Sequence, residues 1–137
     1  MTSAASAIEA AAYAALTAGV TLSPVHQHVP QDTPPPVTIV GDIDLEPFQT
    51  KDQDGDRQGT LVITCVVEGE ARKPLLDLQD EVEAALSGLR VEAGGWLLLF
   101  TFQSSDGLLV ADPVSEESEG GETYVGTSRF NVLALSN

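Results

Sequence analysis

The chain has 137 residues and a formal net charge of -15, because 21 Asp and Glu residues stand against 6 Lys and Arg residues. This length is typical of one domain, and we expect a single domain over residues 1–137. A surface that binds nucleic-acid phosphates needs clustered Lys and Arg, so the charge argues against such a surface. No apolar stretch reaches the roughly 18 residues that a membrane-spanning helix requires, so we expect no membrane partner.

Residues 4–18 are strong helix formers rich in alanine, with Ser3 as the expected N-cap and Gly19 as the stop signal. Alanine buries little area but lets two backbones approach closely. We therefore expect this helix to lie against a sheet or against a neighbouring subunit. After it, the proline-rich residues 20–36 predict an extended, semi-rigid connection.

Two expected strands flank an acidic loop. The residues VTIV, 37–40, begin a strand that runs into the acidic residues 42–46, and TLVITCVV, 60–67, predicts the second strand. The second run is β-branched and apolar on both alternating faces, which is typical of an inner strand covered on both sides. Between the two strands we expect an acidic loop at 49–59.

From Arg72 onward the apolar period changes to that of a helix, and Gly88 marks its expected end. One helical face collects Leu75, Leu78, Val82, Ala85, Leu86 and Leu89. The acids of this segment fall mainly off that face. The pattern therefore predicts a core helix with a solvated acidic side.

The C-terminal part of the chain predicts two more strands. They are WLLLFTF, 96–102, and TYVGTSRFNVLAL, 123–135, with Gly126 as a candidate β-bulge. Between them, residues 104–121 hold a short apolar piece and then a segment rich in Gly, Ser and acids. This composition predicts a mobile insertion.

The order helix, strand, strand, helix, strand, strand predicts an α+β fold: a mostly antiparallel, mixed sheet of about four strands with two helices packed on one face. The other face then needs cover. Val62 and Val66 point away from the apolar residues that alternate with them, so another copy of the protein is the expected cover. We take Val62, Val66 and Trp96 as candidate subunit-interface residues, with core packing the alternative for Trp96.

Asp52, Asp54 and Asp56 occupy every second position around Gly55, as the first ligands of a calcium loop do. An EF-hand loop also needs Gly at its sixth position and a bidentate Glu at its twelfth. Neither register of this loop supplies both residues. We therefore expect a solvated turn and no metal site.

Signatures of enzymes are absent from the sequence, which has no G-x-S-x-G elbow, no P-loop and no dinucleotide-binding glycine pattern. His26 and His28 would point the same way from an extended segment and can hold zinc, but the sequence offers no third ligand. Cys65, the single cysteine, lies within an apolar strand without a base nearby, where a thiol is inert. We therefore expect no enzymatic activity and no cofactor.

Several segments, taken in order, resemble one family. An alanine-rich helix leads into VHQHVPQDTPPPVTIVGDI, followed by an acidic loop, TLVITCVV, the helix LLDLQDEVEAAL and the last strand GTSRFNVLAL. This arrangement resembles the tail terminator, or tail completion, proteins of long-tailed phages and of phage-derived particles such as gene transfer agents. The resemblance covers nearly the whole chain, and its most specific residues are Val29, Pro30, Pro36, Arg129 and Phe130. Val37 stands where the family often has an aromatic residue, and the insertion at 104–121 is longer than usual.

The resemblance implies a non-enzymatic protein of the virion tail, assembled in the cytoplasm of the bacterial host. Family members form a six-fold ring that caps the polymerised tail tube, stops its growth and joins it to the connector or stopper protein on the head side. The implied partners are further copies of the chain, the tail tube protein and that connector, while DNA passes through the channel without specific binding. Asp52, Asp54 and Asp56 would then line the channel or face an adjoining ring, unless they only make the turn soluble.

Three other interpretations remain. A head-side neck or stopper ring belongs to the same biology and differs in its binding partner. An acidic inhibitor that mimics DNA would have a similar size and charge, but it needs its acids on a rigid face, whereas many acids here fall in expected loops. An enzyme is the third interpretation, and its only support is His26 and His28 with nearby Asp32.

Overall fold

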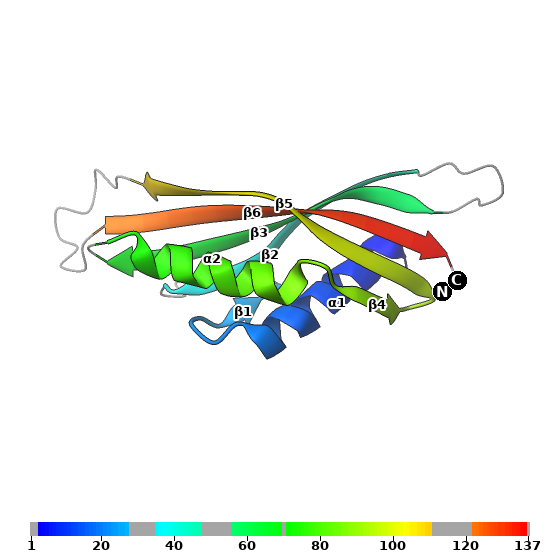
Figure 1. Cartoon of the computed structure of the whole chain (residues 1–137), viewed down its shortest axis with the longest axis horizontal. Coiled ribbons are helices and arrows are strands. Elements are labelled where there is room, and N and C mark those ends of the chain that lie inside the picture. Colours follow the sequence, from blue (N-terminus) through cyan, green and yellow to red (C-terminus); the bar gives the residue numbers. More distant parts are fainter. Residues whose placement is uncertain (1–2, 28–34, 48–55, 70, 111–121, 137) are drawn as a thin grey trace.

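Figure 1 shows the computed structural model, which describes residues 3–27, 35–47, 56–69, 71–110 and 122–136. Over these ranges the chain forms two helices and six strands. In chain order they are α1 (Ala4–Gly19), β1 (Val25–His26), β2 (Val37–Pro47), β3 (Arg57–Gly69), α2 (Lys73–Leu86), β4 (Arg90–Ala93), β5 (Trp96–Val110) and β6 (Glu122–Ser136).

All six described strands belong to one sheet with the order β1-β2-β3-β6-β5-β4. β1 runs parallel to β2 and the other neighbours are antiparallel, so the sheet is mixed. The prediction of about four strands is therefore wrong, although the α+β class is consistent with the structure. The two missed strands, β1 and β4, hold only 2 and 4 residues, too few for an alternating pattern to stand out.

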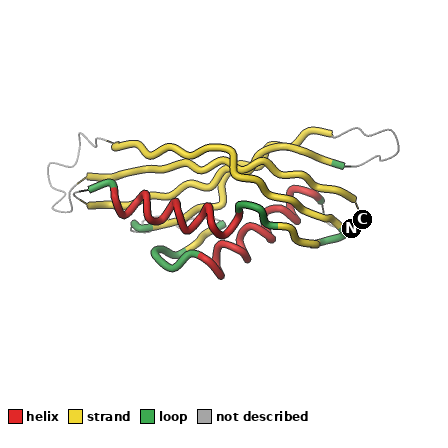
Figure 2. Tube along the Cα trace, in the orientation of Figure 1, coloured by secondary structure: helices red, strands yellow, loops and turns green. Residues whose placement is uncertain are grey.

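The sheet curls into a half-barrel around the helices (Figures 1 and 2). Helix α1 contacts β1 and β2 at one edge of the sheet and β4 and β5 at the other, which requires both edges to bend toward it. Helix α2 lies between α1 and the central strands, where it contacts β3, β6 and β5. Register shifts between Val40 and Ile43 in β2, and between Phe102 and Ser104 in β5, supply local bends.

Each predicted strand is longer in the structure than its apolar segment indicates. β5 continues to Val110 because residues 104–110 pair with β6, although the sequence predicted a mobile insertion there. The backbone ladder explains this correction, since strand hydrogen bonds form between main-chain groups whatever side chains they carry. The rest of the expected insertion, residues 111–121, lies outside the described residues.

Helix α1 begins where the sequence predicts, because the hydroxyl of its N-cap, Ser3, accepts a hydrogen bond from the Ser6 amide at 3.2 Å. Its buried residues are Ala4, Ala7, Ile8, Ala12 and Leu16. At its end, a methyl group on Gly19 would stand 3.0 Å from Ala85 Cβ of α2, so small residues let the two helices approach closely. Neither described helix is both long and apolar enough to span a membrane.

Helix α2 turns the predicted apolar face to the sheet and ends at Leu86, shortly before Gly88 with its φ of 76°. Its buried residues are Leu75, Leu78, Gln79, Val82 and Leu86. Gln79 is the polar member, and its Nε2 donates to the Asp106 carbonyl oxygen at 2.7 Å. This hydrogen bond offsets the cost of burying the amide and ties α2 to β5.

Helix α2 packs closely over a pair of glycines, Gly107 in β5 and Gly126 in β6, which face each other across the ladder. A methyl group on Gly126 would collide with the Gln79 amide and stand 2.9 Å from Leu75 Cδ1. One on Gly107 would stand 3.1 Å from Leu75 Cδ2. The expected bulge at Gly126 is wrong, since the register runs unbroken through this residue, and glycine serves there to make room for α2.

We predict that Gly126→Ala destabilises the fold by about 1–3 kcal/mol, the usual cost of an added carbon in a tightly packed site. The new methyl group forces α2 away from the sheet or displaces the Gln79 side chain. Urea denaturation followed by circular dichroism measures the change. The control is Gly69→Ala, because a methyl group there meets nothing within 4 Å. Equal urea midpoints for the two variants would contradict this packing.

Candidate assembly surfaces

One face of the sheet is covered by the helices, and we call the other face, without helices, the outer face. In β3, Leu61, Ile63 and Cys65 are buried under the helices. Val62 and Val66 alternate with them, point to the outer face and are half-buried. Within the single chain these two valines are therefore available to a neighbouring molecule.

The outer face is hollowed where β2, β3, β6 and β5 lie side by side. The hollow has a volume of about 500 Å³, and its lining includes Glu46, Gln58, Thr60, Leu99, Asn131 and Leu133. At its rim, Gln58 Nε2 donates a hydrogen bond to Glu46 Oε1 at 3.2 Å. Such a mixture of polar and apolar side chains is typical of protein–protein contact surfaces.

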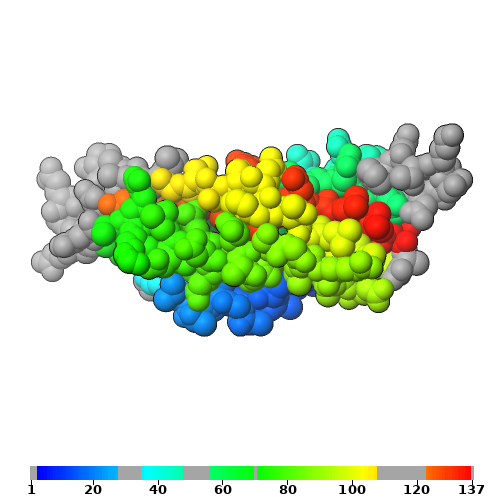
Figure 3. Space-filling view, in the orientation of Figure 1, coloured from blue at the N-terminus to red at the C-terminus, as the bar shows by residue number. Residues whose placement is uncertain are grey.

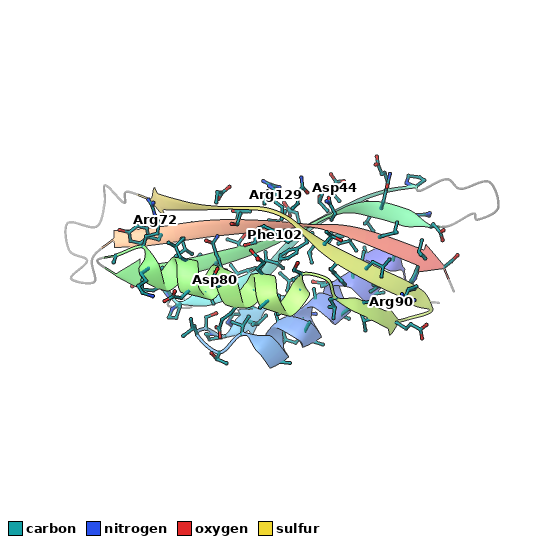
Figure 4. The ribbon with its side chains drawn as sticks, viewed as in Figure 1. Asp44, Arg72, Asp80, Arg90, Phe102 and Arg129 are labelled. Carbon is teal, nitrogen blue, oxygen red and sulfur yellow. The ribbon has the colours of Figure 1, made fainter. Side chains whose placement is uncertain are left out.

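The charges near the outer face are mainly acidic. Asp42, Asp44 and Glu46 are exposed along β2, and Arg129 is exposed on β6. Figure 4 shows Asp44 and Arg129 on the side of the sheet away from α2, with Arg90 beside β4. Arg129 makes no ion pair within the described ranges. Its guanidinium is therefore free to meet an acidic group of a partner.

Trp96, the third candidate interface residue, lies at the start of β5. Its side chain belongs to the hydrophobic core and is only 7% exposed. In the single chain it therefore offers little surface to a neighbour.

The acidic triplet is only partly described, because Asp52 and Asp54 lie outside the described residues. Asp56 is 1% exposed, and its Oδ1 accepts hydrogen bonds from the Ser136 amide at 2.8 Å and from the Ser136 hydroxyl at 3.1 Å. These bonds tie the start of β3 to the end of β6. A role facing the channel or a ring therefore stays a prediction for Asp52 and Asp54, while Asp56 points into the protein.

Of the three linker residues that carry the resemblance, the structure describes only Pro36. Pro36 directly precedes β2, and its peptide bond with Pro35 is cis. Val29 and Pro30 lie outside the described residues.

Of the two histidines, the structure describes only His26. His26 lies in β1, and its buried Nε2 has no hydrogen-bond partner among the described residues. His28 and Asp32 lie outside the described residues. Over the described part of the chain, no group of three or more His, Cys, Asp or Glu side chains converges as a metal site would require. The described residues therefore add no ligand to the histidine pair.

Cys65 lies on the helix side of β3 and is fully buried. Burial raises the pKa of its thiol from 9.0 to about 11, and the neighbouring Thr38 hydroxyl, 3.9 Å from the sulfur, only partly opposes this rise. The thiol therefore stays protonated at neutral pH, and a protonated thiol is a poor nucleophile.

A second hollow, the α1–β4 groove, lies between helix α1 and the edge strand β4. It has a volume of about 480 Å³ and is lined by Ala10, Ala11, Ala14, Ala15, Leu89, Val91 and Ala93. Figure 3 shows α1 (blue) beside the segment that carries β4 on one side of the molecule. The sequence marked the alanines of α1 for close approach but missed the groove, because β4 was not predicted.

The turn after α1 is held by a carboxylate of α2. Glu81 accepts hydrogen bonds from the Thr21 amide at 3.0 Å, the Thr21 hydroxyl at 2.7 Å and the Leu22 amide at 3.0 Å. These bonds, with the Thr21 hydroxyl first, lower the pKa of Glu81 from 4.5. Leu22, at the tip of this turn, is 51% exposed. The hydrogen bonds to Glu81 thus hold the backbone of a turn whose large apolar side chain, Leu22, is exposed to solvent.

The fold is similar to that of a chain in the solved virion of a native gene transfer agent particle. The two agree with a TM-score of 0.77 over 96% of this chain and 97% of that chain, at 16% sequence identity. The sequence matches no protein-family model and no curated protein. At this level of identity the likeness establishes the shared fold.

We predict that Cys65 in the folded chain reacts with a thiol reagent at about pH 8 at least about a hundredfold more slowly than in the urea-unfolded chain. A pKa raised from 9.0 to about 11 lowers the thiolate fraction by about that factor, and burial blocks access as well. Absorbance of the released reagent group measures both rates. Similar rates in the two states would show that the thiol is accessible.

We also predict that Glu81→Gln lowers stability near neutral pH, and that its difference from the wild type shrinks as the pH falls below about 4.5. A carboxylate whose folded pKa is lowered stabilises the fold above its unfolded pKa, and this contribution is lost as the pH falls through the folded pKa. Urea midpoints measured from about pH 3 to about pH 7 test the prediction.

The matched control for Glu81→Gln is Glu83→Gln on the same helix. No hydrogen bond to the Glu83 carboxylate is found among the described residues, so we expect little change in the midpoint at any pH. If the two variants gave the same pH profile, the turn would not depend on Glu81.

Proposed function

We propose that this chain is a structural protein of a virion or virion-like particle. The observation that carries the proposal is the fold that it shares with a chain of the gene transfer agent virion, over 96% of one chain and 97% of the other. Because the likeness covers both chains almost end to end, it concerns the whole fold rather than a local motif. We propose no catalytic role.

Within the particle, we propose the role of tail terminator: a ring of copies that caps the tail tube, ends its polymerisation and joins the tail to the head connector. The sequence resemblance supports this finer role, and its described residues occupy defined positions. Pro36 directly precedes β2, Phe130 is buried in the core, and Arg129 is exposed on the outer face. The protein would then belong to the tail, assembled in the bacterial host cytoplasm.

The outer face is the surface that we propose for the tail tube or the connector. It carries the half-buried Val62 and Val66, the hollow beside Leu99, and Arg129, which has no ion-pair partner among the described residues. Apolar side chains at the centre of a contact supply most of its free energy, and a charged residue beside them favours partners of opposite sign. The arrangement therefore suits a partner with an apolar patch, an acidic group opposite Arg129 and basic groups opposite the acids of β2.

The net charge of -15 agrees with a channel through which DNA passes. Acidic walls repel phosphate groups, and without clustered Lys and Arg no counterions are released to hold the duplex. Asp52 and Asp54 remain the proposed channel-facing or ring-facing residues. DNA would then pass the ring without specific binding.

We predict that tails assembled without this protein grow beyond their normal length and that adding the purified chain stops their growth. A Val62→Asp, Val66→Asp double variant should fold but bind tails at least about tenfold more weakly, because it places charge in the apolar centre of the contact. Tail length by electron microscopy and co-sedimentation with tails measure the two effects.

The matched control is Ala84→Asp, which places an acid on an exposed position of α2, far from the outer face. It should cap tails as the wild type does. Binding of the wild type to DNA-filled heads but not to tails would replace the terminator with a head-side neck ring. Binding to neither would overturn the proposal.

A further inference from the structure

We propose that copies of this chain join head to tail, with Leu22 of one copy seated in the α1–β4 groove of the next. The inference rests on the proposed ring and identifies the two surfaces that build it. They lie on the helix side of the molecule, so the outer face stays free for other partners.

The groove is suited to receive an apolar side chain. Its lining is almost entirely apolar, and Ala10 and Ala14 on its helix wall are exposed in the single chain. Alanine has no side-chain atom beyond Cβ, so an incoming chain can approach the helix backbone closely. A hollow of about 480 Å³ easily holds a leucine side chain with part of its turn. Covering this surface removes apolar area from water, which favours association.

Leu22 is the side chain best placed to fill the groove. Among the described residues, only Leu22 and Leu76 are large apolar side chains with high exposure, at 51% and 47%. Leu76 projects from a helix face, whereas Leu22 stands at the tip of a turn that Glu81 holds with three hydrogen bonds. A tip that is already ordered loses less conformational entropy on binding. The structure therefore favours Leu22.

Charge supports the same pairing. Glu68 and Asp77 line a small hollow together with Leu22. Lys73 forms an ion pair with Asp77, so Glu68 and the turn-holding Glu81 supply the negative charge near the tip. Arg90 is exposed at the start of β4, beside the groove, and makes no ion pair within the described ranges (Figure 4). When Leu22 enters the groove of another copy, its acidic surroundings come near this arginine. Opposite charges at the rim orient the two copies.

The two surfaces are distinct, because the groove lies beside the middle of α1 whereas Leu22 follows its C-terminal end, and this determines the kind of assembly. Figure 1 shows the turn after α1 on one side and β4 on the other side of this helix. A copy therefore uses Leu22 toward one neighbour and its groove toward the next. Contacts between two different surfaces repeat around a ring if the rotation closes, and a ring is what the proposed function needs.

The test uses three variants of the full chain, with mass measured by light scattering. Leu22→Asp and Ala14→Arg should each weaken self-association at least about tenfold, because each destroys one of the two surfaces. Leu76→Asp is the matched control and should associate as the wild type does. An equimolar mixture of Leu22→Asp and Ala14→Arg should form dimers and nothing larger, since one partner keeps the groove and the other keeps Leu22.

If the free wild type is a monomer, the same contact is tested on tails with a Leu22→Cys, Ala14→Cys variant, whose oxidation should give a ladder of cross-linked copies. Cys65 does not interfere, because it is buried. The contact would be overturned if Leu22→Asp and Ala14→Arg each associated as the wild type does. It would also be overturned if the oxidised double-cysteine variant gave no cross-linked copies on tails. If Leu22→Asp and Ala14→Arg both still cap tails, the contact is refuted but the terminator role is not. If the wild type forms rings that do not bind tails, the terminator role is refuted but the contact is not.

Discussion

Helix α2 can lie close to the sheet because Gly107 and Gly126 carry no side chains beneath it. Leu75 and the Gln79 amide occupy the space that these glycines leave, and the bond from Gln79 to the Asp106 carbonyl fixes the height of the helix. The position of α1 follows, since Gly19 meets α2 at Ala85. The position of the exposed turn after α1 also depends on α2, since Glu81 of α2 holds this turn. Removing the glycine pair would thus move the helices, the turn and the α1–β4 groove together.

The curl of the sheet separates the two surfaces that an assembly protein needs. Because the half-barrel closes around the helices, the helix side carries the α1–β4 groove and Leu22, while the outer face carries Val62, Val66 and Arg129. A subunit in a ring must contact its neighbours around the ring and other proteins along the axis. In our proposals these two tasks fall to two surfaces on opposite sides of one sheet, so they do not compete.

The sequence predicted the features that depend on local patterns. Ser3 as the N-cap, the buried face of α2 and the alternation around Val62 follow from residues near each other in the chain. Features that depend on distant residues were missed. Nothing near Thr21 indicates its bonds to Glu81, and nothing near Gly126 indicates a glutamine pressed against it. The polar part of β5 and the short strand β4 are likewise set by pairing with neighbouring strands.

The proposed ring contact is small, since one leucine and the rim around it bury far less than the about 800 Å² per partner that a standard interface buries. Copies with this net charge, brought together in the proposed ring, also repel one another. A closed ring compensates for both effects, because each copy then makes two contacts and the last contact forms without further loss of translational freedom. A tail tube that already holds several copies side by side supplies the same advantage. In this scheme the ring forms most readily on the finished tube, where it is needed to stop growth.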